Sequence, residues 1–196
     1  GRNKLAFSVL TRQLMNFNFG SRQISNNGIP VAGIITTGGL SMKQDFKEIW
    51  TGASYSHKLN KLIGLGATAY IAYRSQTTEF QTVIEELQPD NQIASLLIYR
   101  KLNFSNYRTL LKAGVAINLK PITFGLTITT PSIDILGSGS YGYNHLVNDP
   151  GDISNNVYET ESQNDLKSKY HSSWAVGAGS AYWGKKFNLH FSTEWY

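Results

Sequence analysis

The sequence predicts an all-β fold: an antiparallel transmembrane β-barrel, of which about seven strands lie in this chain. Two observations predict it. Seven stretches alternate apolar residues with small or polar ones at period two, the repeat of a strand that has one apolar face. The connections between them are alternately short and long, as in barrels whose tight turns lie on one side of a membrane and whose loops lie on the other.

The composition favours strands over helices as membrane-crossing elements. The chain has 196 residues, is 41% hydrophobic and has a mean hydropathy of -0.26. It contains no run near the roughly 18 apolar residues that a membrane helix needs. Cysteine is absent, which excludes disulfide and thiolate chemistry. The net charge of +5 is spread along the chain, whereas a nucleic-acid site would cluster its cations.

The first three strands are predicted at residues 4–20, 45–57 and 62–74. The third alternates most cleanly, with isoleucine, leucine and alanine at odd positions and glycine, threonine and tyrosine at even ones. A long connection with turn signals at residues 26–28 and 38–39 separates the first two strands. The second and third are joined by a tight turn at Leu59 and Asn60, which makes them antiparallel neighbours.

The next strand is open to two interpretations. Residues 75–91 form a long connection that either extends the third strand or contains one helical turn. Residues 92–102 and 108–120 are then two apolar pieces. We interpret them as one long strand with a bulge, because this keeps every short turn on one side and every long loop on the other.

The remaining strands are predicted at 122–130, 172–183 and 187–195. Pro121 marks a tight turn, and Pro131 ends the fifth strand because proline cannot donate to a ladder. A long polar loop, residues 132–171, precedes the last two strands. Closed bacterial barrels have even strand numbers, so seven strands predict that residues 1–196 are part of a single larger barrel domain.

Three features favour a membrane over a soluble core. The polar faces carry many small residues, which suits a lumen, and two strands reach or exceed the 9–11 residues of a membrane strand. Aromatic residues, which suit the headgroup boundary, lie near strand ends. They are Trp50, Tyr73, Tyr99, Trp174, Tyr182 and Trp195. The alternative that remains open is a soluble sandwich or lipocalin-like barrel.

Residues 122–139, ITFGLTITTPSIDILGSG, resemble the FadL/TodX-type outer-membrane transporters of long-chain fatty acids, in particular their divergent Bacteroidetes members. Residues 49–76 and the run from Asn106 into KAGVAINLKP fit the same family. The resemblance implies a barrel of about 14 strands, an N-terminal hatch and an apolar ligand pocket. The hatch and its Asn-Pro-Ala start are not found in this chain.

The expected function is passive uptake of hydrophobic small molecules such as long-chain fatty acids across the bacterial outer membrane. Expected partners are outer-membrane lipid, the hydrophobic ligand and other outer-membrane proteins. By strand parity the lumen-facing candidates are Arg12, Asn16, Asn18, Thr68, Tyr70, Arg74, Thr123, Thr127 and Thr129. Of these we expect Arg12, Asn16, Tyr70, Arg74 and Thr127 to bind ligand. Arg12 and Arg74 either pair with a carboxylate or stabilise the lumen through contacts with a plug.

No catalytic residue, metal ligand or cofactor site is predicted. The four histidines lack metal-site spacing. Residues 137–142 match G-x-G-x-x-G, but no helix follows, so these glycines are expected in a loop. The acidic residues between 149 and 165 match no calcium-loop pattern and are expected to be solvated. The alternative function is a non-transporting barrel subunit that docks partners in an outer-membrane secretion or assembly complex.

Overall fold

The computed structural model describes residues 2–25 and 35–196. These residues are almost entirely strand. The strands are β1 (Asn3–Ser25), β2 (Ile35–Lys58), β3 (Ile63–Leu87), β4 (Ile93–Leu119), β5 (Ile122–Thr129), β6 (Ile133–Asn148), β7 (Val157–Lys167), β8 (Ala175–Trp183) and β9 (Asn188–Trp195), with one 3-10 turn, η1 (Ile153–Asn155). No helix within the described ranges has the length and hydropathy of a membrane span.

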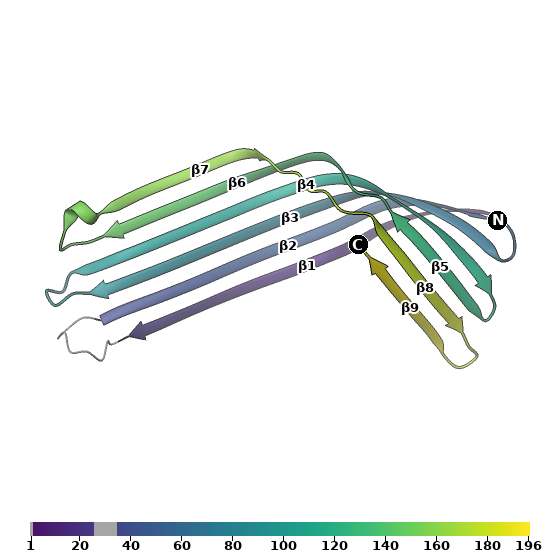
Figure 1. Ribbon diagram of the computed structural model, residues 1–196, viewed down its shortest axis with the longest axis horizontal. Coiled ribbons are helices and arrows are strands. Elements are labelled where there is room, and N and C mark those ends of the chain that lie inside the picture. Colours follow the sequence, from purple (N-terminus) through teal and green to yellow (C-terminus); the bar gives the residue numbers. More distant parts are fainter. Residues whose placement is uncertain (1, 26–34) are drawn as a thin grey trace.

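All strands belong to one antiparallel sheet in the order β1-β2-β3-β4-β5-β8-β9 (Figure 1). The 27-residue β4 pairs with β5 along residues 112–119 and with β6 along residues 95–109. Strand β7 pairs with β6, as β8 pairs with β5. The nine strands of the described residues therefore occupy seven positions, with β5 and β6 sharing one and β7 and β8 sharing the next.

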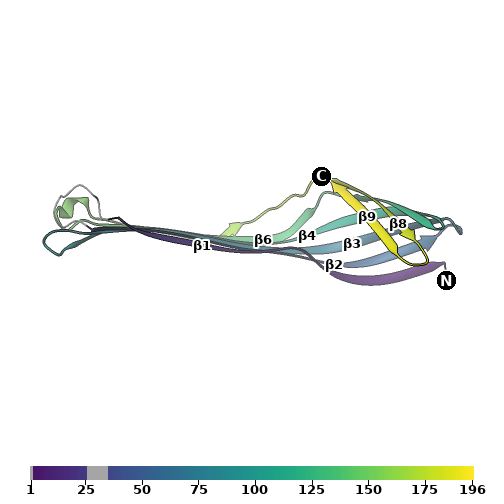
Figure 2. The same ribbon diagram turned by 90° about the horizontal axis from the view of Figure 1, so that it is seen from below.

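The sheet is flat at one end and strongly curled at the other, so that it forms a half-barrel (Figure 2). Three tight turns, at residues 59–62, 120–121 and 184–187, lie at the curled end, which we call the turn end. The turns at 88–92 and 149–156 lie at the flat end, which we call the loop end. The predicted all-β, antiparallel, curled fold is confirmed at this level.

The single long fourth strand is confirmed, but the bulge lies elsewhere. Strand β4 pairs with β3 without a shift in register from Ile63 to Leu87. The irregularity is on its other side, where Tyr107 pairs with Leu136 and Arg108 with Asp134, which leaves Ile135 of β6 as the extra residue. The bulge belongs to the strand that follows Pro131, where the ladder is already broken.

For residues 75–91 the strand extension is the correct alternative, since β3 runs on to Leu87 without a helical turn. The predicted long loop 132–171 is wrong, because it contains β6 and β7. The glycines of residues 137–142 thus lie in a strand and not in a loop. Both faces of these extensions mix polar and apolar residues, so period-two hydropathy cannot reveal them. Strands β1 and β2 likewise cover most of 21–44, and the turn signal at 26–28 lies outside the described residues.

Face parity in β1 changes at a bulge that the sequence did not reveal. Thr11 pairs with Ile49 and Gln13 pairs with Glu48, so Arg12 is the extra residue of a register shift. Before the shift the even positions of β1 share the face of Trp50; after it the odd positions do. Asn16 and Asn18 therefore lie on the opposite face from the one predicted.

The concave face holds the small core of the described chain. Tyr70, Ala72 and Leu110 are buried, and Trp50 packs against them, with its ring centroid 5.3 Å from that of Tyr70. Gly52 makes this packing feasible, because a Cβ there would lie 2.5 Å from the Tyr70 ring. Trp50, predicted at a membrane boundary, is thus a core residue inside the half-barrel.

The convex face carries an apolar band around the turn-end half of the sheet. By pairing register, its positions on β2 to β5, β8 and β9 include no Asp, Glu, Lys or Arg within the described chain. Members that are more than a third exposed include Phe7, Leu65, Ile71, Leu111, Ile117, Phe124, Leu126, Ile128, Leu189 and Phe191. Toward the loop end the same face becomes charged, with ion pairs between Lys43 and Asp45 and between Lys101 and Glu79.

Candidate ligand site inside the half-barrel

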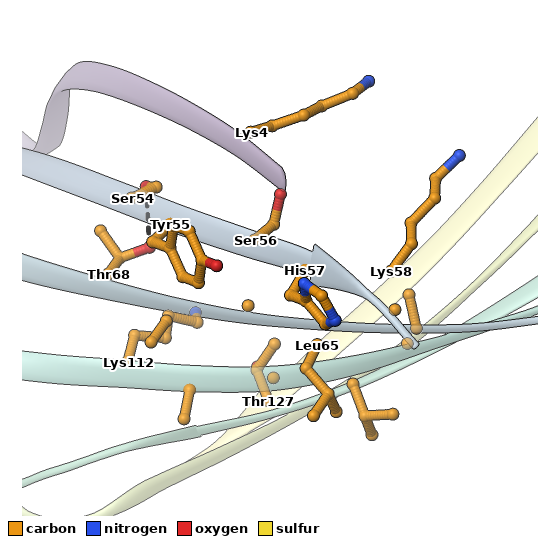
Figure 3. A pocket seen from close by; sticks show the side chains of 18 of the residues that line it. Lys4, Ser54, Tyr55, Ser56, His57, Lys58, Leu65, Thr68, Lys112 and Thr127 are labelled. Atoms are coloured by element: carbon orange, nitrogen blue, oxygen red, sulfur yellow. Dashed lines mark hydrogen bonds between the residues drawn. The ribbon is translucent and has the colours of Figure 1, made fainter. Parts of the chain in front are cut away.

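The concave face of the turn-end half is a groove of about 570 Å³ (Figure 3). Small and hydroxyl side chains from alternate positions of β2 to β5 form its floor, because these positions face inward where the convex ones are apolar. Lys4, Lys58 and Lys112 also line the groove. Ser54 and Thr68 hydrogen-bond across the floor at 2.8 Å. The floor residues include Ser54, Gly64, Gly66, Thr68, Gly114, Ala116, Gly125 and Thr127.

Thr127 is seated between two glycines on neighbouring strands. It pairs with Gly114 of β4 on one side and Gly177 of β8 on the other. A Cβ at Gly114 would lie 2.9 Å from the Thr127 methyl, and one at Gly177 would lie 2.7 Å from its hydroxyl. The small neighbours keep the groove open at this point, and Thr127 Oγ1 donates to the Gly177 carbonyl at 3.4 Å.

A buried ionic cluster closes the groove toward the loop end. Glu48 forms an ion pair with Arg108 at 2.6 Å and lies 4.0 Å from the Arg74 guanidinium. It also accepts a hydrogen bond of 2.6 Å from the Trp50 indole. Glu48 and Arg108 are almost fully buried. Two cations therefore share one carboxylate, a state that needs tight geometry because desolvation of the charges is costly.

The segment of residues 168–174, which follows β7, crosses over this cluster. The Tyr170 ring contacts both guanidinium groups, with its centroid 3.9 Å from the Cζ atom of Arg74 and 4.5 Å from that of Arg108. Such cation–π contacts gain strength when they are desolvated. The crossing segment thus acts as a plug that covers the ionic cluster.

Side chains of β6 and its approach fix the backbone of the crossing segment. Asp134 accepts from the Tyr170 backbone N–H at 3.1 Å and from Asn106 at 2.9 Å. Ser132 and Ser172 exchange two hydrogen bonds of 3.0 Å between backbone N–H groups and hydroxyls. Asp134 also lies 3.0 Å from the His171 ring.

A second ionic group joins the two edges of the sheet. Glu194 of β9 pairs with Arg12 of β1 at 2.6 Å and with Lys112 of β4 at 3.3 Å. The Arg12 guanidinium also lies 5.3 Å from the Trp50 ring. Because β1 and β9 are the first and last strands of the sheet order, these side chains span the open side of the half-barrel.

A cavity of about 470 Å³ lies between the two ionic groups and under the crossing segment. Arg108 and Arg12 line it together with Glu48, Glu194, Trp50 and Tyr170. The Nε and Nη1 groups of Arg108 are buried and have no hydrogen-bond partner in the structure. The cavity is therefore lined by charged and aromatic side chains, unlike the groove below it.

Four of the five predicted ligand residues lie on the concave face, but they do not converge on one site. Thr127 lies in the groove, Tyr70 in the core, Arg74 in the ionic cluster and Arg12 in the edge-to-edge group. Asn16 lies on the convex face, where it hydrogen-bonds Asp45. Of the other parity candidates, Thr68, Thr123 and Thr129 share the concave face and Asn18 does not.

The sequence did not reveal the ionic cluster or the residues that hold the crossing segment over it. Glu48, Arg108, Asp134 and Tyr170 come from four separate segments that only the fold brings together. A signal was present for two of them: Glu48 and Arg108 are charged residues at concave-face positions of strands, a placement that is costly without a partner. Tyr170 lies in the predicted loop 132–171, outside the stretches with a period-two pattern.

Comparison with known proteins does not assign this chain to a family. No protein-family model matches the chain, and no curated protein matches it.

Proposed function

We propose that this chain is part of an outer-membrane β-barrel that takes up hydrophobic small molecules, such as long-chain fatty acids, by passive transport. The charge-free apolar band on the convex face supports this proposal most strongly. On β3 it covers residues 63–73, between the turn and Arg74. This is about the 9–11 residues that a tilted strand needs to cross the hydrocarbon core.

The groove supports the transport part of the proposal. Its volume of about 570 Å³ falls within the range of roughly 300–1,000 Å³ that is typical of small-molecule pockets. Its glycine, alanine and methyl-bearing threonine residues offer a smooth surface to an alkyl chain, and Lys4, Lys58 and Lys112 line the same groove. Arg12 and Arg74 already contact carboxylates of the chain itself, so we assign them to lumen stability and not to the ligand.

The packed ionic cluster favours a second candidate function. A lumen that is closed at mid-height suits a barrel subunit that docks partners in an outer-membrane secretion or assembly complex and transports nothing. The two candidates differ in the groove, which only a transporter needs to keep open for ligand.

The test is binding of radiolabelled palmitate to the full-length protein purified from cell envelopes in detergent. Gly66→Leu would fill the groove, since a Cβ at Gly66 meets only ordinary contacts. Ala69→Leu is the matched control, three residues away, exposed on the convex face and outside the groove lining. We expect at least tenfold weaker binding for Gly66→Leu and unchanged binding for Ala69→Leu.

Heat-modifiable gel migration shows whether each variant is folded. If the folded protein binds no palmitate and copurifies with a stoichiometric protein partner, the docking function would replace transport as the proposal. Recovery of the protein in the soluble fraction would overturn the membrane assignment itself.

A further inference from the structure

The two ends of the half-barrel carry opposite charge in their turns. The described turns at the turn end contain lysines and no carboxylate: Lys58 and Lys61 border the first, Lys120 lies in the second, and Lys185 and Lys186 lie in the third. The described turns at the loop end contain Asp90, Asp149 and Asp152 and no lysine or arginine. The five turn-end lysines are all exposed, and none forms an ion pair with a carboxylate of the described chain.

Large apolar side chains stand between these lysines. Leu59 and Leu62 flank Lys61, Leu119 precedes Lys120, and Trp183 and Phe187 enclose the lysine pair. Each of these apolar side chains is more than half exposed. Exposed aliphatic and aromatic groups that alternate with cations are typical of a surface at the headgroup level of a bilayer, where lysine stems lie along apolar surface and their ammonium groups reach outward.

We infer that these three turns form a binding surface for anionic phospholipid headgroups in the membrane leaflet at the turn end. The surface continues directly from the apolar band, since the turns connect the same strands that carry it. Headgroup phosphates supply the negative charge that the turns lack, and the attraction of lysines to anionic lipid is electrostatic and short in range. The inference rests on the membrane location in the proposed function but does not require transport.

The test compares anionic with zwitterionic lipid in vesicles that contain the full-length protein. Brominated phosphatidylglycerol and brominated phosphatidylcholine each quench tryptophan fluorescence, and the ratio of their quenching gives the lipid preference. The turn variant carries Lys58→Gln, Lys61→Gln, Lys120→Gln, Lys185→Gln and Lys186→Gln. The control carries Lys43→Gln, Lys47→Gln, Lys101→Gln, Lys167→Gln and Lys169→Gln, which removes the same number of positive charges from positions away from the three turns.

We expect a preference for phosphatidylglycerol of at least twofold in the native protein and in the control, falling to about one in the turn variant. A native ratio of one, or equal loss in both variants, would overturn the inference. A native ratio of one, together with an acidic protein that the native chain but not the turn variant retains from envelopes, would replace the lipid with a protein partner.

Insertion is scored separately, by heat-modifiable migration after reconstitution into phosphatidylcholine alone. Insertion without lipid preference contradicts only the headgroup surface. Failure to insert contradicts both this inference and the proposed membrane function.

Discussion

At the scale of single residues, Glu48 balances the buried charge of the half-barrel. Among the described residues it is the carboxylate in ion-pair contact with both Arg74 and Arg108. A buried ion pair adds little net stability over apolar packing, yet removing one partner leaves an uncompensated charge. Glu48 thus determines whether two guanidinium groups can stay in the lumen.

Glu48→Gln is therefore expected to destabilise the protein by about 3–5 kcal/mol, the usual cost of breaking a buried pair. The measurement is reversible urea unfolding in vesicles, followed by tryptophan fluorescence. Glu79→Gln is the control, because Glu79 pairs with Lys101 in a partly exposed site and such pairs contribute about 0–1 kcal/mol. Equal effects of the two changes would show that the cluster is solvated.

The turn between β6 and β7 offers a prediction about pH. The Asn155 side-chain amide donates to Asp149 at 2.9 Å, and this bond, with the backbone N–H groups of Gly151 and Asp152, holds the pKa of Asp149 below its usual value. Because the pKa of Asp149 is lower in the folded protein, its carboxylate stabilises the turn at pH values above its unfolded pKa of about 3.9. This stability is lost as the pH falls through the pKa of Asp149 in the folded protein.

Asn155→Ala should raise the pKa of Asp149 toward that unfolded value, because it removes the largest stabilising contact of the carboxylate. Carboxyl-detected NMR titration of the protein in micelles measures this pKa. Gln163→Ala, in the neighbouring β7, keeps every contact of Asp149 and is the control. An unchanged pKa in Asn155→Ala would exclude the side-chain bond as the cause.

At the scale of elements, the crossing segment depends on one glycine of β6. A Cβ at Gly137 would lie 2.1 Å from the Ser168 carbonyl oxygen, a distance that backbone atoms cannot accept. Gly142 lies in the same strand, and a Cβ there would meet nothing within 4 Å. These two positions form a matched pair for testing whether the segment is held down.

Gly137→Ala is expected to lift the crossing segment and to increase the rate of tryptic cleavage at Lys169 severalfold, because the local opening free energy falls. Gly142→Ala should leave that rate unchanged. Limited proteolysis with mass spectrometry of the fragments measures both. A cleavage rate at Lys169 as slow in Gly137→Ala as in the native protein would mean that β6 moves to accommodate the methyl group and that the crossing segment stays in place.

The strands differ in how well their inward and outward faces can be predicted from the sequence. The predicted faces of β3 and β5 are correct, because an apolar convex face opposite a small-residue concave one leaves a clear period-two pattern. Parity failed in β1, where the register shift beside Arg12 reverses the faces and no glycine or proline marks it. The plug could not be predicted, since its contacts join residues 36 to 96 positions apart, from the pair Asp134 and Tyr170 to the pair Arg74 and Tyr170.

At the scale of the whole molecule, the convex face separates a membrane protein from a soluble one. Leu126 lies near the middle of β5 and is 52% exposed, while Gln81 lies on the same face of β3 in the loop-end half. In a soluble protein both positions would face water and would accept a charge equally well. In a bilayer only Gln81 would do so.

Leu126→Arg is expected to cost about 2–4 kcal/mol in vesicles, the cost of an arginine on the lipid face near the midplane of a barrel, whereas Gln81→Arg should cost about 0–1 kcal/mol. The measurement is unfolding free energy by urea titration in vesicles of constant thickness, with heat-modifiable migration as the check on folding. Equal costs would place the apolar band in water and would require another protein surface to cover it. A large cost at Leu126 alone would show that the bilayer is the solvent for which this face was selected.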